Sequence, residues 1–103
     1  MSRKLLLTSF QTWLPHQTSN SSDDLLETIA QQDSFPHSLT YLRQLPVDII
    51  QASNRVIDTI ENLRPDNILL CGMAEKRTQL TVESCATCGD TQLRTRVDLK
   101  KLV

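Results

Sequence analysis

Pro65-Asp66-Asn67-Ile68-Leu69-Leu70-Cys71-Gly72 is the segment from which the fold is interpreted first. A continuous apolar run of strand length, entered from a Pro-Asp turn and left through glycine, predicts a central strand over residues 68–71, buried on both faces. The polar loop from Met73 to Glu83 then leaves the carboxyl edge of that strand. Because ligands of open α/β sheets bind outside these edges, this loop is the best candidate for a site.

Two strands and two helices are expected before this segment. Residues 4–10 start with an apolar run too short for a helix and predict a first central strand, and residues 38–42 predict a strand beside it. Ser21 precedes an apolar pattern and predicts the start of a helix over residues 22–32, and helical spacing predicts a second helix over residues 48–63. The alternation of strands and helices predicts a parallel sheet with right-handed crossovers.

A hairpin is expected after the loop. Two extended runs, residues 82–88 and 91–99, flank Gly89-Asp90, a spacer typical of a tight turn. In the second run Leu93 and Val97 face one side, with Thr95 and Leu99, while the arginines and Asp98 face water. The expected fold is α/β, of the three-layer sandwich type, in a single domain spanning residues 1–103. Two helices leave one sheet face or edge poorly covered, which predicts self-association.

Composition limits the class of protein. The chain has 103 residues, 39% of them hydrophobic and 22% charged, which is typical of one small soluble domain. A net charge of −1 indicates neither a nucleic-acid partner nor a membrane partner. No apolar run approaches the roughly 18 residues needed to span a bilayer. Three cysteines without a secretory signal favour reduced thiols and a cytoplasmic protein.

Six segments follow the pattern of a known family. They are Thr8-Ser9-Phe10, Trp13, Asn20-Ser21-Ser22, Leu45-Pro46-Val47, Arg64-Pro65-Asp66, and Cys71-Gly72-Met73-Ala74 through Arg77 to Glu83. In order and spacing they resemble pyroglutamyl peptidase I, a family of cysteine peptidases that removes amino-terminal pyroglutamate from peptides. The resemblance covers nearly all of this chain and the amino-terminal half of a family member, so the fold is expected to be incomplete relative to the family.

The resemblance implies roles for five residues. Phe10 and Trp13 match the two aromatic residues that sandwich the pyroglutamyl ring in that family, and Met73 stands at a substrate-binding position where the family has glutamine. Glu83 matches the acid of the Cys-His-Glu catalytic set. Arg77 matches a family arginine and supports the loop, or pairs with a nearby glutamate. The implied partners are amino-terminal pyroglutamyl peptides and further copies of the chain, with no cofactor and no metal.

The departures from the family pattern leave two functions open. Family glycines are replaced in the first loop by Ser9, Leu14 and Pro15, and in the second loop by Glu75 and Lys76. The nucleophilic cysteine and the histidine of the family lie in its carboxyl-terminal half, beyond the position of residue 103. The chain is therefore expected to act as a peptidase if that half supplies both groups. The alternative is a non-catalytic relative that serves as a binding or interaction module.

The remaining cysteines and histidines suggest a third possibility. The spacing of Cys85 and Cys88 suits a redox pair or half of a zinc site, but no second pair with matching spacing exists and both lie in the predicted hairpin, so a structural role is favoured. Cys71 is interpreted as a small buried hydrophobe. His16 and His37 are interpreted as surface histidines, although His16 lies in the loop beside the first strand.

Overall fold

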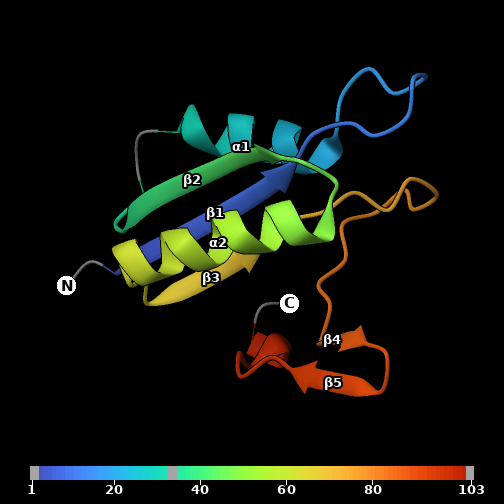
Figure 1. Ribbon diagram of the computed structural model, residues 1–103. Helices are drawn as coiled ribbons and strands as arrows, with labels where there is room; N and C mark the ends of the chain where they lie inside the picture. Colours follow the sequence, from blue (N-terminus) through green and yellow to red (C-terminus); the bar gives the residue numbers. More distant parts are fainter. Residues whose placement is uncertain (1–2, 33–34, 102–103) are drawn as a thin grey trace.

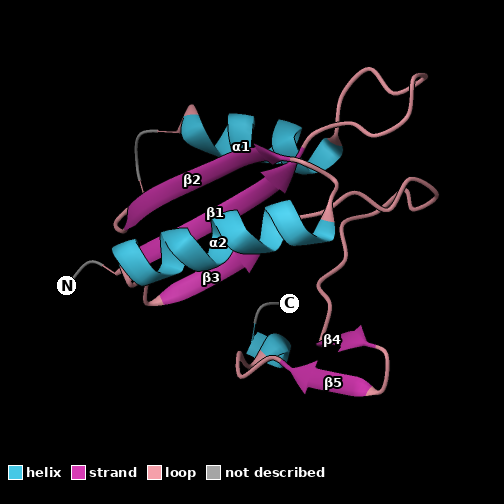
Figure 2. Cartoon of the chain, in the orientation of Figure 1, coloured by secondary structure: helices cyan, strands magenta, loops and turns pink. Residues whose placement is uncertain are grey.

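The computed structural model describes residues 3–32 and 35–101 and contains a parallel α/β unit followed by a hairpin (Figures 1 and 2). Its elements in chain order are β1 (Lys4–Phe10), α1 (Ser21–Ala30), β2 (Ser38–Leu45), α2 (Ile49–Leu63), β3 (Asn67–Leu70), β4 (Cys85–Cys88), β5 (Thr91–Arg94) and a short 3₁₀ helix, η1 (Leu99–Lys101). The predicted α/β class is therefore confirmed.

The sheet has the order β2-β1-β3, and both pairs of strands are parallel. Leu6 of β1 lies opposite Thr40 on one side and opposite Ile68 on the other. Helix α1 connects β1 to β2, and α2 connects β2 to β3 on the other side of β1. The two crossovers run in opposite directions across the sheet, so right-handed connections place α1 and α2 on opposite faces. Figure 1 shows this arrangement, with α2 in front of the sheet and α1 on the far side.

The core lies around β1, because successive side chains of this strand point to opposite faces. Ser9 contacts α1 through Asp23, whereas Phe10 lines a hollow with Ala52 of α2. The buried apolar side chains of the described residues are Leu6, Leu7, Leu26, Leu45 and Ala52. This is a small core, and it depends on a single central strand.

The expectation that residues 68–71 form a central strand buried on both faces is wrong. Strand β3 pairs with β1 on one side only, and no other described strand pairs with its second edge. Ile68, Leu69 and Leu70 are 42%, 48% and 65% exposed. An apolar run predicts a strand, but whether it is buried depends on neighbours that are distant in sequence. β1 is the central strand, as predicted.

Both expected helices are present, and only their first and last residues differ from the prediction. Asn20, rather than Ser21, caps α1, because its side-chain oxygen accepts a hydrogen bond from the backbone N–H of Ser22 at 2.9 Å. Helix α1 ends at Ala30 instead of continuing to residue 32. Helix α2 is capped by Asp48 and ends at Leu63, and its C-cap residue Arg64 adopts the left-handed conformation with φ 50°.

The hairpin is shorter than expected and is exposed on both faces. Its strands β4 and β5 pair antiparallel around Gly89, whose φ of +58° at the first central turn position suits a type II′ turn. Leu93 and Val97 are 69% and 47% exposed, so the expected apolar face of residues 91–99 is not buried. The pairing ends at Arg94. Figure 1 shows the hairpin beyond β3, reached through the loop of residues 71–84, which turns back on itself before β4.

Among the helices built from residues 3–32 and 35–101, none is long and apolar enough to cross a membrane.

Candidate functional site

The loops that follow β1 and β3 emerge at the carboxyl edge of the sheet and flank a shallow, open cavity of about 260 Å³. We call residues 11–20 the first loop and residues 71–84 the second loop. The residues that line the cavity are Phe10, Trp13, Asn20, Val47, Gly72 and Met73. The structure thus brings together three of the residues expected to bind substrate, namely Phe10, Trp13 and Met73. Their binding role stays a prediction.

The polar groups at this cavity are largely occupied by local structure. The buried Asn20 caps α1 with its oxygen, and its amide nitrogen donates to the carbonyl oxygen of Gln11 at 3.1 Å. The backbone N–H of Ser21 donates to the sulfur of Met73 at 3.3 Å, which ties the second loop to the start of α1. A thioether is only a weak acceptor. The remaining lining of the cavity is therefore mainly apolar and aromatic.

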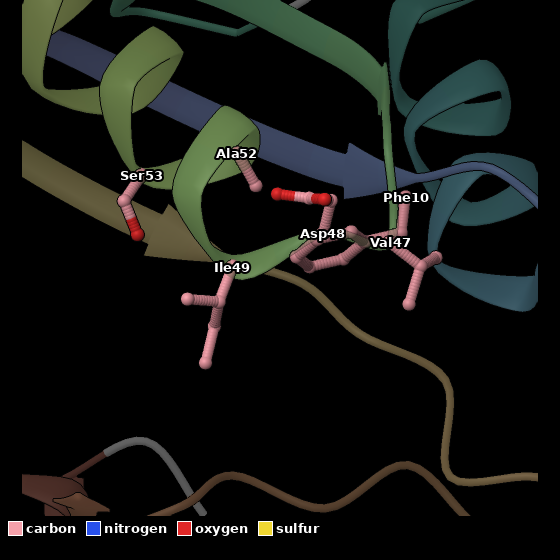
Figure 3. A pocket seen from close by; sticks show the side chains of 6 residues that line it. All are labelled: Phe10, Val47, Asp48, Ile49, Ala52 and Ser53. Carbon is pink, nitrogen blue, oxygen red and sulfur yellow. The ribbon is translucent and has the colours of Figure 1, made fainter.

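A second hollow of about 470 Å³ adjoins the first (Figure 3). It is lined by Phe10, Val47, Asp48, Ile49, Ala52 and Ser53. Phe10 and Val47 line both hollows, so the two lie side by side near the end of β1 and the start of α2. The Asp48 carboxylate accepts from the backbone N–H of Gln51 at 2.9 Å and is the cap of α2. The rest of the lining is mostly apolar.

The two loops are joined by Glu75, a residue that stands where the resembled family has glycine. One carboxylate oxygen of Glu75 lies 2.7 Å from Nε2 of His16, and the other accepts from the side-chain amide of Gln17 at 2.8 Å. These hydrogen bonds, first that of His16 and then that of Gln17, lower the pKa of Glu75. His16 is thus an exposed histidine, as expected, but it has a carboxylate partner.

Glu83 does not line either hollow. Its carboxylate pairs with Arg77 at 2.7 Å, and both side chains are more than half exposed. Arg77 also donates to the hydroxyl of Thr81 at 2.8 Å. It therefore pairs with a nearby glutamate and also contacts a second residue of the same loop. The structure therefore does not bring Glu83 together with Phe10, Trp13 and Met73. Its catalytic role stays a prediction.

The three cysteines are free thiols in different surroundings. Burial raises the pKa of Cys71, whose backbone N–H continues the ladder to β1 by donating to the carbonyl oxygen of Thr8 at 3.0 Å. Cys85 and Cys88 are the first and last residues of β4, three positions apart. Side chains at that spacing point to opposite faces of a strand and their Cα atoms lie about 10 Å apart. This geometry does not suit a disulfide within the strand.

A partly buried polar cluster that joins β1, α1 and β2 was not found from the sequence. Asp23 of α1 accepts two hydrogen bonds from Arg43, at 2.7 and 3.0 Å, and one from the hydroxyl of Ser9 at 2.8 Å. Gln44 donates its side-chain amide to Asp23 and its backbone N–H to Ser9. The hydrogen bonds from Arg43, more than those from Ser9 and Gln44, lower the pKa of Asp23 to about 2. The available signal was Ser9, a polar residue that follows the apolar run of β1.

The chain was compared with protein-family models, curated proteins and solved structures. None of them matches it. The interpretation of the cavity therefore rests on its own geometry and on the resemblance of its motifs.

Proposed function

We propose that this chain is a pyroglutamyl-peptidase-like protein whose carboxyl-edge cavity binds the amino-terminal pyroglutamyl residue of a peptide. The observation that carries the proposal is that Phe10 and Trp13, at the end of β1 and in the first loop, and Met73 of the second loop line one cavity of about 260 Å³. A five-membered lactam has two apolar faces that suit contact with aromatic side chains. The cavity is of the right order for a single small ring.

The adjoining hollow accommodates the rest of the peptide. Phe10 and Val47 line both hollows, so a peptide with its ring beside Trp13 can continue past them toward Ile49. The lining along α2 is mostly apolar, and it favours an apolar side chain at the second position of the peptide. We therefore expect pyroglutamyl-leucine and pyroglutamyl-phenylalanine peptides to bind better than pyroglutamyl-glycine peptides.

The peptidase step needs groups in addition to this cavity. Cysteine-peptidase chemistry requires a thiolate beside a base, and donors for the oxyanion. Burial favours the neutral thiol of Cys71, so this cysteine is poorly suited as the nucleophile. In the peptidase form of the proposal, the cysteine and the histidine come from a carboxyl-terminal half. Glu83 would then orient that histidine.

A second candidate is a non-catalytic relative that binds pyroglutamyl peptides without cleaving them. It is favoured by the pairing of Glu83 with Arg77, away from the cavity lining. Release of aminomethylcoumarin from its pyroglutamyl amide separates the two candidates. Turnover by a protein that includes the carboxyl-terminal half, lost in Glu83→Gln, supports the peptidase, whereas binding without turnover by the same protein supports the non-catalytic module.

Met73 offers a direct test of ligand binding, because the resembled family has glutamine at its position. Trp13 is the only tryptophan, so its fluorescence reports binding of pyroglutamyl-leucine amide at the cavity. Met73→Gln supplies an amide for the lactam and should tighten binding about threefold to tenfold, the worth of one hydrogen bond. Leu80→Gln, at a residue that is 81% exposed, is the control. No fluorescence change in the wild type would refute the proposal.

Two broader expectations accompany this function. Free thiols support a reducing compartment, and we propose that the protein is cytoplasmic. We also propose that it self-associates, because the exposed strand β3 presents apolar side chains and an unpaired edge within the described chain. Leu69→Lys should lower the mass measured by light scattering. A monomeric wild type would contradict self-association.

A further inference from the structure

The first loop contains a short relay of hydrogen bonds that ends at Trp13. The side-chain oxygen of Gln17 accepts from the backbone N–H of Trp13 at 2.9 Å and from that of Leu14 at 3.2 Å. The side-chain amide of the same Gln17 donates to Glu75 in the second loop at 2.8 Å. Gln17 therefore connects the backbone of Trp13 to Glu75, which lies 58 positions after Gln17 in the chain.

Both carboxylate oxygens of Glu75 are used in this connection, one by Gln17 and the other by His16. A carboxylate that accepts from two side chains fixes their relative position better than a single contact does. Trp13 lines the cavity with Met73, which lies two residues before Glu75. The connection thus closes a ring made of the first loop, the cavity and the second loop.

We propose that Glu75 is a positioning residue, which latches the first loop to the second through Gln17 and His16 and so holds Trp13 over the cavity. In the resembled family this position is glycine, which has no side chain to make such a contact. The substitution therefore gives this chain a means of closing the cavity that the family pattern lacks.

The hydrogen bonds that form the latch can break while the rest of the domain stays folded. The side chains of Glu75 and His16 are 42% and 65% exposed, so water competes for both partners and the contact is individually weak. Loops held by few, exposed hydrogen bonds open locally without unfolding the domain. An open latch frees the first loop, which gives a ligand access to the space beneath Trp13. Formation of the latch then covers the ligand.

Quenching of Trp13 fluorescence by acrylamide tests the latch on the whole chain without any ligand. Trp13 is 40% exposed, so its release should raise the quenching constant of Glu75→Ala about twofold. Glu83→Ala is the matched control, since Glu83 is also an exposed glutamate of the second loop that accepts a hydrogen bond. An unchanged constant in Glu75→Ala, or an equal rise in Glu83→Ala, would overturn the proposal.

A double substitution separates positioning from a general loss of structure. Because Glu75 acts on Trp13 through Gln17, adding Glu75→Ala to Gln17→Ala should raise the quenching constant little further. Additive rises would contradict the relay. The urea midpoints of both variants should equal that of the wild type, because the latch lies outside the core.

The ligand experiment rests on the proposed function, whereas the quenching experiment does not. If pyroglutamyl-leucine amide binds the wild type, its dissociation should be about threefold to tenfold faster in Glu75→Ala, since a loosened loop releases ligand more readily. Unchanged dissociation would contradict the role of the latch in binding. If the wild type binds no pyroglutamyl peptide, the proposed function fails, and the quenching result alone decides the latch.

Discussion

Replacing Asp23 with asparagine removes one negative charge from the cluster that joins β1, α1 and β2 while keeping the size and shape of the side chain. The carboxylate of Asp23 accepts hydrogen bonds from Arg43, Ser9 and Gln44, and its side chain is 12% exposed. The pKa falls from the ordinary 3.8 to about 2. At roughly 1.4 kcal/mol for each pKa unit, this shift corresponds to about 2 kcal/mol of folding free energy.

The sign of the pH dependence follows from the depressed pKa of Asp23. Since the carboxyl group binds its proton less readily in the folded chain, its stabilising effect is fully present above pH 3.8. The effect is lost as the pH falls from 3.8 through about 2. Asp23→Asn should therefore lower the free energy of unfolding by about 2 kcal/mol near neutral pH, and the difference from wild type should shrink in acid.

Urea unfolding followed by circular dichroism measures this difference at several pH values. Asp24→Asn is the control, because Asp24 also lies in the first turn of α1 but is exposed. That change removes a favourable interaction with the helix dipole and should cost only about 0.5 kcal/mol. Equal losses in the two variants, or a loss in Asp23→Asn that does not depend on pH, would refute the assignment of the stabilisation to the partly buried ion pair of Asp23 and Arg43.

Three other predictions concern the fold and the thiols. Leu26→Ala should lower the free energy of unfolding in urea by about 3 kcal/mol because Leu26 is fully buried. Leu93→Ala on the exposed hairpin should lower it by under about 0.5 kcal/mol, and similar losses in the two variants would contradict the placement of Leu26 in the core. Arg64→Gly should raise the unfolding free energy by about 0.5 kcal/mol, since the left-handed conformation at φ 50° strains a non-glycine residue; a loss would contradict this. Cys71 should react with a disulfide reagent several-fold more slowly than Cys88, because burial raises the Cys71 pKa while Cys88 is exposed; equal rates would contradict it.

Local pattern is sufficient to predict the order of the elements in this chain. Apolar runs at residues 4–10 and 67–70 are too short for helices, and the helical spacing of residues 49–63 is distinct from strand alternation. Such periodicities depend only on neighbouring residues, so they can be recognised in a single sequence. The carboxyl-edge cavity follows from the same alternation, because parallel strands present their ends on one side.

Burial and pairing over long sequence distances could not be predicted in the same way. Ile68–Leu70 are as apolar as Leu5–Leu7, yet Ile68–Leu70 lie at an exposed edge of the sheet and Leu5–Leu7 lie at its centre. Asp23 and Arg43 are 20 positions apart, and His16 and Glu75 are 59 apart. No local pattern marks either pair, since their contact depends on how the strands and loops come together in space.

A two-dimensional NMR titration with pyroglutamyl-leucine amide tests directly whether the cavity at the carboxyl edge binds a pyroglutamyl residue. If the cavity binds the peptide, the backbone amide resonances of Phe10, Trp13 and Met73 should shift together and saturate with one dissociation constant. The resonances of the hairpin strands β4 and β5 should stay in place. Prolyl-leucine amide, which has the ring without the lactam carbonyl, should bind more weakly. Resonances of the cavity residues that do not move at saturating peptide, or shifts confined to the hairpin, would contradict the account.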